Sequence, residues 1–126
     1  MFEKLKYEMY CYITSVTVQI WIDGDELHFS KELLGEDKIK DQVSKMSVTD
    51  FLKRLEALDI EHWKKKFEPE GVAYMDGVNW SLNYETSDNK PFKTWGDNTY
   101  PANFNEFEKL MVDVVGKIAL VDGEEE

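Results

Sequence analysis

The feature that most constrains the fold of this 126-residue chain is an alternating run that ends at an Asp-Gly pair. Apolar side chains recur at every second position of the run, at Val16, Val18, Ile20 and Ile22. Asp23-Gly24 follows, and Leu27 and Phe29 then restart the alternation. Because the tight turns between antiparallel strands require positive φ, which Asp-Gly adopts readily, this pattern predicts a β-hairpin with one buried face. Residues 7–13 are expected to form a neighbouring strand.

A second hairpin is predicted in the stretch from residue 71 to residue 107. Large apolar side chains alternate with polar ones there, at Trp80, Leu82 and Tyr84. The partner strand is expected around residues 92–95, with Gly96 breaking it. Together with the first hairpin and its neighbour, the two patterns predict an antiparallel sheet of about five strands.

A long amphipathic helix is predicted to begin at Ser47, whose side chain can accept a hydrogen bond from the backbone N–H three positions on. Apolar residues then recur at spacings of three and four as far as Trp63. Lys64–Lys66 are expected in the last turn, where cations complement the helix dipole. Pro69 and Gly71 are expected to end this helix.

A second helix is predicted after Pro101, because the fixed φ of proline suits the first turn of a helix. Asn103 and Glu106 have the spacing of a capping box. The expected buried stripe consists of Phe104, Phe107, Met111, Val114 or Val115, and Ile118.

These elements predict one α+β domain over residues 1–121, with two main helices packed on the sheet, and an acidic tail over residues 122–126. Strands, a hairpin and an aromatic-led helix occur in the same order twice, which favours two ββα-like halves. Residues 31–46 have no clear period and are expected to form a short helix or an exposed loop.

The net charge of −11 is concentrated in the second half of the chain. Residues 67–126 carry 13 carboxylates and four basic side chains. Such a field repels phosphate backbones and attracts basic proteins, so we expect no nucleic-acid partner and consider a basic protein partner. Acidity that only keeps the protein soluble is the alternative. The lone Cys11, the lack of an evident signal peptide and the lack of a membrane-spanning run favour a cytoplasmic protein without a membrane partner.

No motif in the chain indicates a cofactor, a metal site or an enzyme. His28, His62 and Cys11 lack the close pairing of zinc ligands, and no nucleotide-binding or nucleophile motif is present. His28 lies between Leu27 and Phe29 on a strand, so it is expected to point away from the core.

The candidate binding residues lie in and around the second hairpin. Tryptophan and tyrosine are common interface anchors, and carboxylates would complement a basic partner. The candidate surface therefore consists of Asp76, Glu85, Trp95, Asp97, Asn98 and Tyr100. The alternative is that the segment from Trp95 to Tyr100 only fixes the corner between the strand and the following helix.

One group of proteins carries a similar pattern. The order Asp76-Gly77-x-x-Trp80, followed by Gly96-x-Asn98-x-Tyr100-Pro101-x-x-Phe104, resembles small uncharacterised bacterial proteins with a D-G-x-x-W strand and a G-x-N-x-Y-P-x-x-F corner. The resemblance covers roughly residues 48–111. It implies a bacterial cytosolic protein of the Gram-positive kind and carries no activity or site residue.

The leading hypothesis is a small protein-binding module of the immunity-protein or inhibitor kind. A phage-type inhibitor that mimics DNA is one alternative, and it requires carboxylates spaced like phosphates along one face. A small hydrolase is another, using two carboxylates from Asp76, Glu85 and Asp97.

Overall fold

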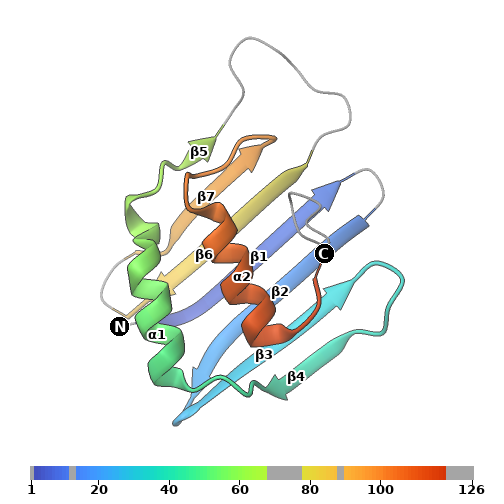
Figure 1. The fold of residues 1–126 in the computed structure, drawn as a ribbon, viewed down its shortest axis with the longest axis vertical. Helices are drawn as coiled ribbons and strands as arrows, with labels where there is room; N and C mark the ends of the chain where they lie inside the picture. The colour runs from blue at the N-terminus through green and yellow to red at the C-terminus, as the bar shows by residue number, and fades with distance from the viewer. Residues whose placement is uncertain (1, 12–13, 68–77, 88–89, 119–126) are drawn as a thin grey trace.

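The computed structural model describes residues 2–11, 14–67, 78–87 and 90–118 as one seven-stranded sheet with two helices on one face (Figure 1). The strands are β1 (Phe2–Cys11), β2 (Thr14–Asp23), β3 (Glu26–Leu33), β4 (Ile39–Val43), β5 (Lys66–Phe67), β6 (Asn79–Thr86) and β7 (Phe92–Asp97). The helices are α1 (Val48–Leu58) and α2 (Phe104–Val115), and a 3₁₀ turn spans Ile60–His62. The strand order is β4-β3-β2-β1-β6-β7-β5, antiparallel except for the pair β5–β7.

The α+β class and both predicted hairpins are confirmed. Asp23 pairs with Glu26 across the β2–β3 turn, and Gly24 there has φ 66°. In the second hairpin, β6 pairs with β7 along its length. The acidic tail, the Asp76-Gly77 turn, Pro69 and Gly71 lie outside the described residues.

The described sheet has two strands more than the five that the sequence pattern indicates. β4 lies within residues 31–46, so the prediction of a short helix or loop there was wrong. Four of its five residues are exposed, because β4 is an edge strand, and it therefore lacks an alternating pattern. Four strands precede α1, whereas β5, β6 and β7 precede α2, so two matching ββα halves are not confirmed.

Helix α1 begins as predicted and ends earlier. The Ser47 side chain accepts a hydrogen bond from the Asp50 backbone N–H at 3.0 Å. The predicted extension through Lys64–Lys66 was wrong, because Asp59 adopts a left-handed conformation (φ 55°) directly after Leu58. Aspartate tolerates the left-handed conformation better than most residues. A residue in this conformation ends the helix.

The first turn of α2 differs from the predicted capping box. The Asn103 side chain makes no hydrogen bond to its own helix. Its Nδ2 donates instead to the backbone carbonyl of Leu58 at 2.9 Å, at the end of α1. A helix end leaves such carbonyls without intrahelical partners, so Asn103 joins the two helices.

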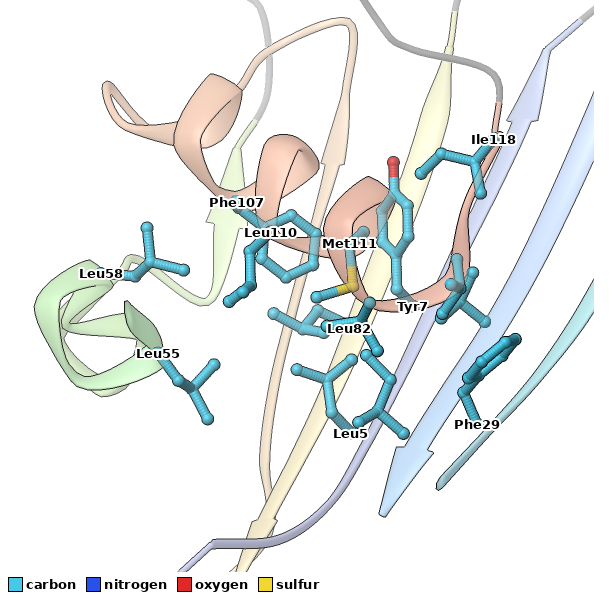
Figure 2. Close-up of a cluster of buried hydrophobic side chains, with 14 of the residues drawn as sticks. Leu5, Tyr7, Phe29, Leu55, Leu58, Leu82, Phe107, Leu110, Met111 and Ile118 are labelled. Atoms are coloured by element: carbon cyan, nitrogen blue, oxygen red, sulfur yellow. The ribbon is translucent and has the colours of Figure 1, made fainter. Parts of the chain in front are cut away.

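The core lies between the helices and the covered face of the sheet (Figure 2). Every member of the predicted stripe is buried, including both Val114 and Val115, although Ile118 follows the end of α2. Tyr7 of β1 meets Phe107 edge-to-face with ring centroids 5.1 Å apart.

Gly96 lies inside β7, so the prediction that it breaks the strand was wrong. It is buried directly against the Trp80 indole, and a Cβ built on Gly96 would come within 2.7 Å of Trp80 Cε2. The Trp80 Nε1–H donates to the Thr99 carbonyl at 3.0 Å. Glycine is therefore required for the close approach of the indole to β7.

Candidate functional site

One face of the sheet is open, because no helix among the described residues covers it and both helices lie on the opposite face (Figure 1). Side chains that point to the helices are buried, as at Leu5 and Tyr7 in β1. The alternate side chains, such as Lys4 and Lys6, point to the open face and are exposed or half-buried. Among the described residues, the side chains of this face are the ones of the sheet that the two helices leave uncovered.

One end of the open face combines carboxylates with large aromatic side chains. Tyr10 is 48% exposed and Trp95 is 40% exposed, although both belong to regular strands. We call this region the acidic–aromatic surface; it consists of Glu8, Tyr10, Glu32, Trp95 and Asp97. Exposed aromatics beside carboxylates are suited to contact a basic protein surface.

The strand register brings these residues together. Glu8 and Trp95 both lie opposite Ser81, one on each side of β6. Tyr10 and Asp97 flank β6 in the same way, two positions along. Because neighbouring strands are about 4.8 Å apart, the β1 and β7 side chains stand about 10 Å apart across the small residues of β6.

Lysines partly balance the carboxylates of this surface. Lys6 lies 4.0 Å from Glu8, and Lys38 lies 3.8 Å from Glu32. The Tyr10 hydroxyl donates to Glu8 Oε2 at 3.0 Å, and this hydrogen bond raises the pKa of Tyr10 above its usual value. Tyr10 therefore stays neutral at physiological pH, and the hydrogen bond orients its ring.

Two of the six predicted binding residues, Asn98 and Tyr100, hold the corner between β7 and α2. Asn98 has φ 56°, and its Oδ1 accepts a hydrogen bond from the Val78 N–H at 2.9 Å. The Tyr100 ring is half-buried on the helix side, with its centroid 6.5 Å from Trp80 and 5.2 Å from Phe104. For these two residues the geometry agrees with the alternative interpretation of a structural corner.

The other predicted residues are not gathered into one site. Trp95 and Asp97 share the acidic–aromatic surface, whereas Glu85 lies at the far end of β6. Asp97 pairs with Asn79, six positions before Glu85, which places the two carboxylates roughly 20 Å apart at about 3.3 Å per residue. A glycosidase-type pair needs a separation below about 10 Å. Asp76 lies outside the described residues.

A second group on the open face was not recognised from the sequence. The Trp21 ring stacks on His28 with centroids 6.0 Å apart and an interplanar angle of 28°. His28 Nδ1 lies 2.7 Å from Asp41 Oδ1, a hydrogen bond that raises the pKa of His28, while its Nε2 lies 3.4 Å from Glu26 Oε1 without making a hydrogen bond. The available signal was Trp21 itself, a large aromatic on the polar side of an alternating strand.

The core holds one buried polar pair that the sequence pattern did not indicate. Glu108 of α2 is 2% exposed, and the Tyr7 hydroxyl donates to its Oε2 at 3.2 Å. Burial, reinforced by the nearby Glu108 carboxylate, raises the pKa of Tyr7 well above its usual value. The available signal was spacing, because Glu108 lies four positions after Phe104 and three before Met111 on the buried stripe.

The described residues contain no group of three or more histidine, cysteine or acidic side chains placed to hold a metal ion. Eight of the 13 carboxylates in residues 67–126 lie outside the described ranges. Of the five described carboxylates in that half, Glu85 and Asp97 lie on the open face.

No family model, curated protein or solved structure matches the chain. Within the described ranges, no helix is long and apolar enough to cross a bilayer.

Proposed function

We propose that this chain is a bacterial, cytoplasmic protein-binding module of the immunity-protein or inhibitor kind. It acts by occupying the surface of a basic partner protein with its acidic–aromatic surface. The observation that carries the proposal is the exposure of Tyr10 and Trp95 on regular strands of an open sheet face. Large aromatics held on rigid strands bind with little loss of side-chain entropy, which is why they dominate interface energetics.

The charges beside these aromatics suit a basic partner. Glu8, Glu32 and Asp97 lie at the same end of the open face. The net charge of the chain, −11, would attract a basic protein from a distance, and the carboxylates near the aromatics would orient it on contact. The encounter should therefore weaken as salt increases.

The two alternatives gain less support. A DNA mimic needs an array of carboxylates, whereas lysines such as Lys4, Lys6 and Lys93 stand among those of the open face. A hydrolase needs two neighbouring carboxylates; of the three candidates, Glu85 and Asp97 are far apart, and Asp76 lies outside the described residues.

The test is a pull-down from a lysate of the source organism, treated with nuclease and run at low and high salt. Wild type is compared with Tyr10→Ala and with His62→Ala, whose exposed histidine follows α1. We expect wild type and His62→Ala to retain one basic protein at low salt and to release it at high salt, whereas Tyr10→Ala retains less. An acidic partner, or equal retention by all three proteins, would contradict the proposal.

A further inference from the structure

A hollow of about 470 Å³ lies on the open face, at the end of β6 away from the acidic–aromatic surface. It is lined by the Trp21 ring, by the carboxylates of Glu3 and Glu85, and by the lysines Lys4 and Lys40. This volume falls within the range of small-molecule sites, about 300–1,000 Å³. None of the residues of the acidic–aromatic surface lines this hollow.

Two β-bulges border the hollow. The β1–β6 register shifts between Phe2 and Lys4, so that the consecutive residues Glu3 and Lys4 are both exposed. The β3–β4 register shifts between Phe29 and Lys31, at Ser30, which lines the same hollow. These are the two register shifts among the described strand pairs. Bulges redirect side chains and are frequent beside functional sites. Both bulges therefore redirect side chains at the same hollow.

The Trp21 ring is held in position before any ligand arrives. One side of it stacks on His28, which Asp41 holds at 2.7 Å. Trp21 lines the hollow, whereas His28 does not. A tryptophan face of this kind attracts cations.

The charges around the hollow have both signs and do not neutralise one another. Lys4 is the register partner of Trp21 in β2 and of Glu85 in β6, so it stands between them. In the described part of the chain, no ion pair joins Glu3 or Glu85 to Lys4 or Lys40. Two carboxylates and two ammonium groups thus remain free to contact a ligand of mixed charge.

We propose that this hollow binds a small zwitterionic ligand of the amino-acid type. The cationic head of the ligand lies at Trp21 and Glu3, and its carboxylate is directed to Lys4 and Lys40. Charge-assisted hydrogen bonds at both ends give the site its preference, since a purely cationic ligand would leave the two lysines facing a positive charge. This site is separate from the acidic–aromatic surface, and it does not depend on the proposed protein partner.

The test is a titration of the full chain, labelled with nitrogen-15, with L-arginine and with agmatine, which is arginine without its carboxylate. The Trp21 indole N–H resonance, assigned with Trp21→Phe, reports binding. We expect L-arginine to shift this resonance in a saturable way, with at least tenfold weaker binding of agmatine. An unmoved Trp21 resonance, or equal binding of the two compounds, would overturn the proposal.

Charge-neutralising variants separate the site from general attraction to an acidic protein. We expect Glu3→Gln to weaken both compounds, and Lys4→Gln to weaken L-arginine but not agmatine. Trp95→Phe, on the same face outside the hollow, should change neither. General attraction predicts instead that Lys4→Gln strengthens L-arginine, because L-arginine carries a net positive charge, and that result would also overturn the proposal.

Discussion

Gly96→Ala tests the packing that joins the second hairpin to the core. The added methyl group would meet the Trp80 indole, with Cε2 only 2.7 Å away, and the Thr99 carbonyl. Overpacking a core costs about 1–3 kcal/mol, and moving the indole would also break its hydrogen bond to Thr99, worth about 0.5–1.5 kcal/mol. We therefore expect Gly96→Ala to lower the free energy of unfolding by about 2–4 kcal/mol.

Urea unfolding followed by tryptophan fluorescence measures this change. In a Trp80→Phe background, the smaller ring leaves room for the added methyl group and has no N–H to donate to the Thr99 carbonyl. The loss of stability caused by Gly96→Ala should therefore be smaller in this background by at least about 1 kcal/mol. Gly24→Ala is the matched control: its Cβ meets nothing within 4 Å, and only its positive φ is strained. The cost of Gly24→Ala should be the same in both backgrounds. A cost of Gly96→Ala below about 1 kcal/mol, or one unchanged by Trp80→Phe, would refute the reasoning.

Two further predictions concern the helix junction and the open face. Asn103→Ala should lower the free energy of unfolding in urea by about 0.5–1.5 kcal/mol. Asn103→Ser should lower it by as much, because serine cannot reach the Leu58 carbonyl. A serine variant as stable as wild type would mean that Asn103 caps its own helix. The pKa of His28 is raised, chiefly by its hydrogen bond to Asp41. The protonated His28 side chain therefore stabilises the fold fully below the usual histidine pKa of about 6.5. This stabilisation is lost as the pH rises through the pKa of His28 in the folded protein. His28→Gln should therefore lose more stability relative to wild type near pH 6 than near pH 8.5, and an equal loss at both pH values would contradict this.

The sequence patterns correctly predicted the elements whose structure depends on residues close by in the chain. The Asp23-Gly24 turn, the Ser47 cap and the stripe of α2 each depend on neighbours within one turn or one hairpin. The two edge strands lack such a pattern: β4 pairs with the preceding strand β3, but four of its five residues are exposed. β5 has two residues, and it is a strand only because β7 lies beside it.

The candidate site was predicted only in part, for a related reason. Trp95 and Tyr100 are both aromatic and five positions apart, yet Trp95 faces the open side of the sheet and Tyr100 the helix side. Which side is open depends on where both helices pack, and the local pattern does not contain this information. Trp21 and His28 of the second group depend in addition on Asp41, which belongs to the unpredicted strand β4.

The affinity of Trp95→Ala for the captured basic partner, relative to wild type, tests the central claim most directly. Truncating an exposed anchor at the centre of an interface typically costs at least about 2 kcal/mol, or roughly thirtyfold in Kd. The account predicts a loss of this size in calorimetric titration at low salt, with His62→Ala unchanged. Wild-type affinity in Trp95→Ala would contradict the claim that the open face of the sheet is the binding surface.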